Sequence, residues 1–262
     1  MNYIEENKKY ILDFIEWSET IEDNEKKKFI KFLTDNEFFQ LPASINHHSN
    51  YTGGLADHSI KVEKNLIMLL KVYGIIDKYN IDFIRLIGLF HDLCKIDRYE
   101  MEVDNEEPTK KQYNYLKSLI ANNKEKLSER NINSETLKLK TFKTKSRFSD
   151  LISWLVDNPD SPPPAVSNIK WKYSKDSLPF GHGEKSALFL QKYISNLPDY
   201  VLLAIRWHMS TWKDGDKRKL LNKARKQDPV IQILPMADQM ATIGEDISEM
   251  DINKLKEINI NN

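Results

Sequence analysis

The sequence predicts an all-α protein with a polar, partly irregular segment in its middle. Apolar residues recur at intervals of three and four over most of the 262 residues, which is the spacing of a buried helix face. No run of alternating polar and apolar residues predicts a set of strands. From about Glu100 to Ser177 the chain is polar, rich in lysine and interrupted by prolines, which predicts an insertion among the helices.

Two short helices are predicted at the start of the chain, where we expect an N-terminal helical extension over residues 1–37. Each has apolar residues on one face at helical spacing. These positions are Ile4, Ile11, Phe14, Ile15, Phe29, Phe32 and Leu33.

Two longer helices are predicted next. Leu55–Val72 carries apolar residues at helical spacing along one face. Ile81–Cys94 is apolar nearly all round, which is typical of a helix buried in the core. The second of these helices is therefore expected at the centre of the bundle.

Three further helices are predicted toward the end of the chain. Lys185–Ile194 and Asp199–His208 have helical spacing and are separated by a proline. Asp228 followed by Pro229 resembles an N-cap with proline at the first helical position. The helix that follows contains Pro235, so we expect it to kink or to begin late.

The middle segment contains one predicted helix, Tyr113–Leu127, and a rigid extended loop at Asn158–Pro164. Its basic stretch, Lys138–Arg147, predicts either a solvated loop or a surface that contacts phosphates. We interpret residues 100–177 as an insertion in a single domain that spans residues 1–262.

Composition excludes several classes of protein. Hydrophobic residues make up 40% and charged residues 30% of the chain, which is typical of a globular protein. The formal net charge is +0, so nothing demands nucleic acid or an anionic membrane as a partner. Cys94 is the single cysteine, so no intrachain disulfide can form. No apolar stretch approaches the ~20 residues that span a bilayer, and the first residues lack a secretory pattern. We therefore expect a cytoplasmic protein without membrane contact.

Histidines and aspartates at predicted helix ends are the candidate site. Imidazole nitrogens and carboxylate oxygens bind divalent first-row metals, and helices hold such ligands rigidly. Each residue alone is better explained by packing or capping, whereas the ordered set points to a metal centre. The candidates are two aspartates, Asp92 and Asp238, and the histidines His47, His48, His58, His91, His182 and His208.

This set resembles the HD superfamily of metal-dependent phosphohydrolases, including its phage and bacterial hydrolases. Five segments carry the resemblance: HHSNYTGGLADHS, LIGLFHDLCK, LPFGHGEKS, LAIRWHM and MADQMAT. It covers roughly residues 38–242, with the middle segment unmatched. The resemblance implies an HD-domain helical bundle.

The resemblance also implies six metal ligands and two divalent metal ions. In the family, a histidine after the Gly-Gly-Leu turn, a His-Asp doublet and a late aspartate bind metal, and two more histidines mark the two-metal members. The corresponding residues are His58, His91, Asp92, His182, His208 and Asp238. Such ligands suit manganese, iron, cobalt, nickel, zinc or magnesium, so the identity of the metal stays open.

Catalytic roles follow for Asp92 and Lys95. Asp92 would bridge two metal ions that activate a water molecule for attack on phosphorus. Lys95 resembles a family lysine near the phosphate and would stabilise charge on a phosphoryl oxygen. The implied activity is hydrolysis of a phosphate ester in a nucleotide or a phosphodiester, such as a cyclic nucleotide signal.

Four further residues are candidates for contacts with a phosphorylated small molecule or nucleotide. His48 lies in the loop before the Gly-Gly-Leu turn. Lys185 and Arg206 are near two of the ligand histidines, where ion pairs with neighbouring side chains are the alternative. Tyr173 lies among basic and aromatic residues, a combination that suits phosphates and stacked bases.

Other functions stay open. The Gly-Gly-Leu-x-x-His segment also resembles HD exoribonucleases, which act from 3′ to 5′. We see no separate nucleic-acid-binding domain, so nucleic acid is not the favoured partner. A subset of HD proteins holds two irons with the same ligands and activates oxygen, so a diiron oxygenase is the alternative of another class. A non-catalytic module is disfavoured because every expected ligand is present. The oligomeric state is not predicted.

Overall fold

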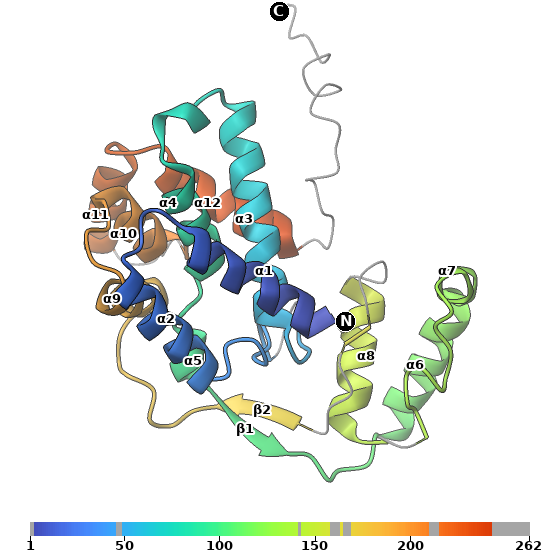
Figure 1. Cartoon of the computed structure of the whole chain (residues 1–262). Coiled ribbons are helices and arrows are strands. Elements are labelled where there is room, and N and C mark those ends of the chain that lie inside the picture. The colour runs from blue at the N-terminus through green and yellow to red at the C-terminus, as the bar shows by residue number, and fades with distance from the viewer. Residues whose placement is uncertain are drawn as a thin grey trace, which may run out of the picture. The chain divides into compact units, whose positions relative to one another are not determined.

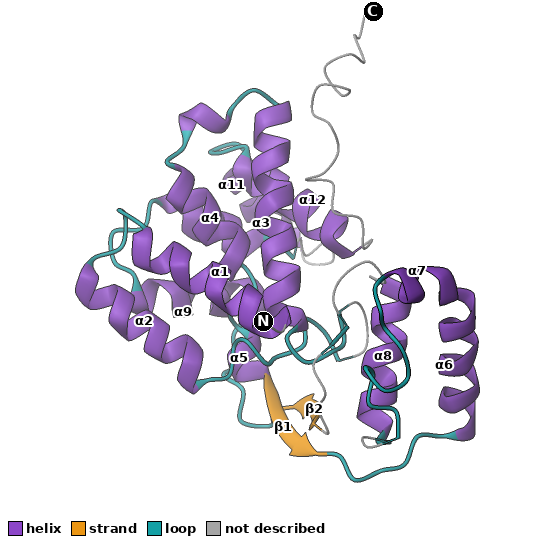
Figure 2. Ribbon diagram, turned by 45° about the vertical axis from the view of Figure 1, so that its right-hand side comes forward, coloured by secondary structure: helices purple, strands orange, loops and turns teal. Residues whose placement is uncertain are grey.

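The computed structural model describes residues 3–45, 49–140, 143–157, 163–164, 169–209 and 215–242. It divides into two compact units. The first unit comprises residues 1–17, 27–58 and 94–179, and the second comprises residues 18–26, 59–93 and 180–262. The described part is mostly helical (Figure 2), which confirms the all-α prediction. None of its helices is long and apolar enough to cross a membrane.

The two predicted N-terminal helices are confirmed as α1 (Tyr3–Trp17) and α2 (Asp23–Asp35). Helix α1 buries the predicted stripe, and α2 buries Phe29 and Leu33. Burial of these apolar side chains stabilises helices that are too short to persist alone in water. Whether residues 1–37 form an extension stays a prediction.

A tight turn sets the start of α3 (Gly54–Val72). Gly53 has a φ of +87°, which favours glycine, and a Cβ on Gly54 would lie 2.1 Å from the carbonyl oxygen of Ser49. The Ser49 carbonyl also accepts a 3.1 Å hydrogen bond from the amide of Ala43. The two glycines therefore allow the loop to fold back closely before the helix that carries His58.

The middle segment contains a two-stranded antiparallel sheet that the sequence did not predict. Strand β1 (Tyr99–Val103) pairs antiparallel with β2 (Ile169–Tyr173), with Tyr99 opposite Tyr173. Figure 1 shows the two strands side by side. Their partners lie about seventy positions apart along the chain, so no local turn signal could reveal the pairing.

Three helices of the middle segment have a core of their own. They are α6 (Lys110–Asn122), α7 (Lys124–Glu129) and α8 (Lys145–Asp157), and α6 packs against α8 (Figure 1). The buried side chains of this core are Leu116, Leu127, Ile132, Leu137, Phe148, Leu151, Trp154 and Leu155. The prediction of one helix from Tyr113 to Leu127 was wrong, because Asn123 leaves helical geometry at φ −102° and ψ 17°.

The basic stretch before α8 is partly structural. Arg147 is buried and donates hydrogen bonds of 2.9 Å to the Pro164 carbonyl and 3.1 Å to the Leu137 carbonyl. Lys145 forms a 2.7 Å ion pair with Glu106. These two basic groups therefore link the start of α8 to other segments of the first unit. Most of the predicted extended loop, residues 158–162, lies outside the described residues, and the insertion over 100–177 stays a prediction.

Asp150 of α8 gives the first unit a measurable pH dependence. Burial raises the pKa of this carboxyl from 3.8 to about 8, opposed by the charge of Arg147 and supported by that of Asp104. Between these values the folded chain keeps a proton that the unfolded chain releases, so the free energy of unfolding falls as pH rises from about 4 to 8. We expect a contribution of up to ~1.4 kcal/mol per pH unit.

Urea denaturation of the wild type and of Asp150→Asn at pH 5, 6, 7 and 8 measures this effect. The wild type should lose stability over that range relative to the variant, which cannot ionise. Equal slopes in both proteins would show that Asp150 ionises normally.

In the second unit, the helices around α10 (Asp199–Trp207) form the core. Helix α10 packs against α4 (Ile81–Phe90), α9 (His182–Tyr193) and α12 (Val230–Thr242). Two further helices belong to the described part of the second unit, η1 (Ile76–Lys78) and α11 (Gly215–Arg225). Helix α5 (Lys95–Arg98) belongs to the first unit.

Helix α12 begins as the Asp-Pro pair predicts, since Asp228 Oδ1 accepts a 2.9 Å hydrogen bond from the amide of Val230. The expectation of a late start was wrong, because Pro235 lies inside the helix. Residues on both sides of Pro235, including Ile233 and Ala237, are buried, and their burial offsets the lost main-chain hydrogen bond.

Candidate metal centre

His91 and Asp92 directly follow α4. The helix begins at an N-cap, where the side chain of Asn80 accepts a hydrogen bond from the amide of Asp82. It ends at Phe90 and not at Cys94 as predicted, and His91 is the C-cap residue with φ −57° and ψ −31°. The buried, apolar face of α4 fixes this end, so the doublet projects from a rigid support.

A glycine brings α4 close to its neighbour α3. A Cβ on Gly88 would lie 2.4 Å from the Cα of Glu63, so only glycine permits this approach. Arg85 of α4 also forms an ion pair with Glu63. These contacts fix α4 against residues 59–72 of α3. The contact at Gly88 is only three residues before His91 in the chain.

His182 and His208 lie at adjoining ends of α9 and α10. His182 is the first residue of α9, and His208 is the C-cap of α10 with φ −60° and ψ −34°. A Cβ on Gly183 would lie 2.3 Å from the Arg206 carbonyl oxygen and 2.5 Å from that of Ile205. The absence of a side chain at Gly183 therefore lets the two helices meet where they carry their histidines.

Asp238 projects from α12, whose position is linked to α3. Asn65 donates a 3.3 Å hydrogen bond to the carbonyl of Ala237, the residue before Asp238. Ala237 is fully buried, whereas the side chain of Asp238 keeps 20% of its surface exposed. The carboxylate is therefore held at a fixed position and is still accessible to a ligand.

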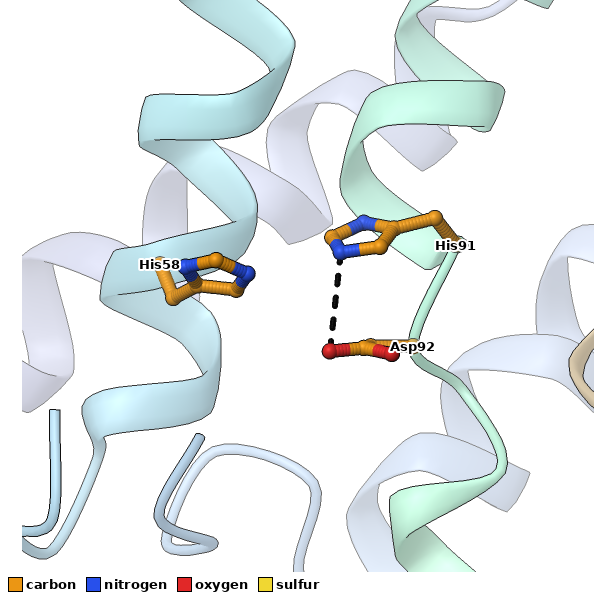
Figure 3. Close-up of side chains that lie close together, drawn as sticks. All are labelled: His58, His91 and Asp92. Atoms are coloured by element: carbon orange, nitrogen blue, oxygen red, sulfur yellow. Dashed lines mark ion pairs between the residues drawn. The ribbon is translucent and has the colours of Figure 1, made fainter. Parts of the chain in front are cut away.

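The five candidate ligands of the second unit lie together, with three imidazoles around Asp92. His182 Nε2 forms a hydrogen bond with Asp92 Oδ1, and His208 Nε2 lies 3.3 Å from the same oxygen. The other oxygen, Oδ2, lies 3.5 Å from His91 Nε2, which in turn lies 3.7 Å from Asp238 Oδ1. The two oxygens of Asp92 thus face different imidazoles. Figure 3 shows the His91–Asp92 ion pair at the end of α4.

Main-chain carbonyls fix the tautomer of two of these histidines. His91 Nδ1 lies 2.8 Å from the Gly88 carbonyl, and His208 Nδ1 lies 2.6 Å from the Ile205 carbonyl. A carbonyl oxygen only accepts, so Nδ1 carries the proton in each ring. The lone pair of each neutral ring is then on Nε2, the atom that faces the carboxylates. This arrangement is typical of histidines that bind metal.

The donor set fits a metal ion. Two sets of donor atoms from the second unit, His91–His208–Asp238 and Asp92–His182–His208, each lie within 4.8 Å of one another. Imidazole lone pairs and carboxylate oxygens repel one another unless a proton or a cation lies between them. The buried histidine and aspartate side chains could therefore hold a metal ion.

The same carboxylates affect the protonation of His91. Burial disfavours its charged form, but the charges of Asp92 and Asp238 outweigh burial and raise the pKa of the imidazole above its ordinary value. A divalent cation would compete with a proton for Nε2, because metal ligands must be deprotonated.

The sixth predicted ligand, His58, belongs to the first unit. It lies on α3 and is fully buried (Figure 3). Helix α3 continues without interruption into the second unit. Of the other predicted residues in the first unit, Lys95 is buried at the start of α5, and Tyr173 is exposed on β2 beneath the guanidinium of Arg98.

Two predicted substrate contacts lie beside the histidines of the second unit. Lys185 is buried one turn into α9. Arg206 is exposed, forms a 2.9 Å ion pair with Glu184 and stacks over the Trp207 ring. The structure therefore shows Arg206 in an ion pair, which was the alternative to a substrate contact in the sequence analysis. His47 and His48 lie outside the described residues.

The sequence did not identify the groups that orient the ligands. These are the carbonyls of Gly88 and Ile205 and the glycine at 183. A local signal was present, because His91 and His208 each end an apolar helix, and each binds the carbonyl three residues earlier.

Comparisons with known proteins give one informative relative. No protein-family model and no solved structure match the chain. It is similar to a curated protein, the dihydroneopterin 2′,3′-cyclic phosphate phosphodiesterase of Methanocaldococcus jannaschii, with 36% identity over 107 residues. The match covers 34% of this chain and 42% of the relative, so the chain spans less than half the length of that protein.

Proposed function

We propose that this protein is a metal-dependent phosphohydrolase of the HD type that cleaves a phosphodiester in a small molecule, with a cyclic phosphate as the favoured substrate. The observation that carries the proposal is the convergence of three imidazoles and two carboxylates, with Nδ1 of His91 and of His208 bound to carbonyls. The similarity to an enzyme named for hydrolysis of a cyclic phosphate supports the phosphodiester as the reacting bond.

His58 is proposed as the sixth ligand. It lies on α3 and is fully buried. A histidine after a Gly-Gly-Leu turn binds metal in the HD proteins that the sequence resembles, and this resemblance supports the inclusion of His58 in the ligand set.

Asp92 is proposed to join two metal positions. Its Oδ1 faces His182 and His208, and its Oδ2 faces His91. A pair of divalent ions, when bound, supplies a nucleophilic water at neutral pH and neutralises charge on the phosphoryl oxygens. The chain's own part is to hold the five ligands of the second unit rigidly. The carbonyls of Gly88 and Ile205 direct the proton of the neutral His91 and His208 rings to Nδ1, which leaves the Nε2 lone pair for a metal.

Lys95 is proposed to bind a phosphoryl oxygen. It follows Asp92 by three residues and is 94% buried. A buried ammonium attracts an anionic group strongly because water screens it little. Arg206 is exposed, so water and salt screen its charge more strongly, and we rank it below Lys95.

The test pairs metal analysis with an activity screen. Protein purified without chelator is analysed for its metal content and is then assayed with bis(p-nitrophenyl) phosphate and the four 2′,3′-cyclic nucleotides under added manganese. We expect close to two metal ions per chain and release of a phosphomonoester. Two irons with oxygen consumption and no hydrolysis would establish the oxygenase instead. A protein that binds no metal would refute the centre.

A further inference from the structure

A polar pocket of about 260 Å³ lies entirely within the first unit. Its lining comes from the loop before α3, from α8 and from β2. The residues that matter here are Asn50, Asp104, Ser149, Asp150, Lys170 and Trp171. None of them belongs to the proposed ligand set.

Most polar groups of this pocket already have partners. Asp104 accepts hydrogen bonds from the amide and the hydroxyl of Ser146. Lys170 forms a 3.0 Å ion pair with Glu106. Ser149 accepts a 2.9 Å hydrogen bond from Gln112. These side chains already have hydrogen-bond or ion-pair partners, so they need no ligand to satisfy them.

Two groups of the pocket have no hydrogen-bond partner among the described residues. The carboxyl of Asp150 is 93% buried and its Oδ2 receives no hydrogen bond. The indole Nε1–H of Trp171 is buried without an acceptor. Buried polar groups are nearly always hydrogen-bonded in native proteins, so two such groups left together in one pocket indicate a missing partner.

The side chains that line the pocket restrict what this partner can be. Lys145 and Lys170 line the pocket, which disfavours a metal cation. The indole N–H of Trp171 needs an acceptor, and the carboxyl of Asp150 needs a polar partner, to which its protonated form can also donate. A volume of this size lies just below the ~300 Å³ at which sites for drug-sized ligands begin, and so fits a single ring system.

We propose that this pocket binds a nucleobase-type heterocyclic ring, which forms a hydrogen bond with the Asp150 carboxyl and accepts one from Trp171 Nε1–H. The pocket is built within one unit, because Asn50 lines it from the loop that leads into α3. The Asn50 side chain fixes this loop by donating a hydrogen bond of 2.9 Å to the Ile45 carbonyl.

The test uses nucleosides, which contain the ring and lack the phosphate. Binding of adenosine, guanosine, cytidine and uridine is measured by calorimetry and ligand-observed NMR on the full chain with chelator present, and ribose serves as the control ligand. We expect saturable binding of at least one nucleoside and none of ribose. Asp150→Leu and Trp171→Phe should each weaken it at least tenfold, since each removes one buried hydrogen-bonding group.

Matched controls are Asp176→Asn and Trp17→Phe, both at exposed positions outside the pocket. Thermal denaturation verifies that each variant is folded, and Trp171→Phe alone carries the test if Asp150→Leu does not fold. No nucleoside binding by the folded wild type, or equal binding by both pocket variants, would overturn the proposal.

A second arm separates the pocket from the proposed reaction. Binding that depends on Asp150 in a protein that hydrolyses nothing would support the pocket and refute the phosphohydrolase.

Discussion

Asp92→Asn will abolish metal binding and hydrolysis together. The carboxylate faces three imidazoles, those of His91, His182 and His208, through its two oxygens. An amide retains the shape but lacks the negative charge that binds two cations. We expect kcat/KM to fall by roughly a thousandfold or more, since the loss of even one oxyanion donor costs about 10²–10³. Elemental analysis and hydrolysis of bis(p-nitrophenyl) phosphate measure the two effects.

The matched control for this variant is Asp77→Asn, at an exposed aspartate in η1 of the same unit. It should keep the metal content and the activity of the wild type. The site as described is refuted if Asp92→Asn retains both metal and turnover. Loss of activity with full metal content would restrict Asp92 to a role in the reaction and remove it from the ligands.

Gly183→Ala will cost stability and disturb the metal centre at once. Its Cβ would meet two main-chain carbonyl oxygens of α10, at 2.3 and 2.5 Å, and main chain cannot move aside as a flexible side chain can. Helix α9 must shift away from α10, and His182 shifts with it. Overpacking of this kind destabilises by about 1–3 kcal/mol. Urea denaturation measures the stability, and elemental analysis measures the retained metal.

The control for the second prediction lies two residues away. A Cβ on Gly181 would meet only the side chain of Glu184, at 3.1 Å, which can rotate aside. Gly181→Ala should therefore be close to the wild type in stability and metal content. Similar behaviour of the two variants would contradict the close approach of α9 and α10.

Most helices could be predicted because their signals are local. The stripe from Ile4 to Ile15 and the apolar run that begins at Ile81 each reveal a buried face without reference to other parts of the chain. Boundaries were less predictable. The apolar run continues to Cys94, but the helix ends at Phe90, where the imidazole of His91 takes over the Gly88 carbonyl.

The middle segment illustrates what local patterns miss. Its polar surface predicted an irregular insertion, yet Trp154 and Leu116 meet in a separate core. Arg147 is one member of a basic stretch in the sequence, but in the structure its side chain is buried. It donates hydrogen bonds to two main-chain carbonyls distant in the chain. Asp150 lies three residues further and has no local signal, since its raised pKa results from burial in the folded unit.

The sequence by itself determined the all-α class and the identity of the candidate ligands, because helical periodicity and the chemistry of imidazole and carboxylate belong to single residues and near neighbours. Only the tertiary structure decided which atoms face one another. The glycines at 88 and 183 set how closely the helices approach, and the carbonyls of Gly88 and Ile205 set which imidazole nitrogen is free. These depend on contacts between helices distant in the chain and on where each helix ends, which the pattern of residues does not specify.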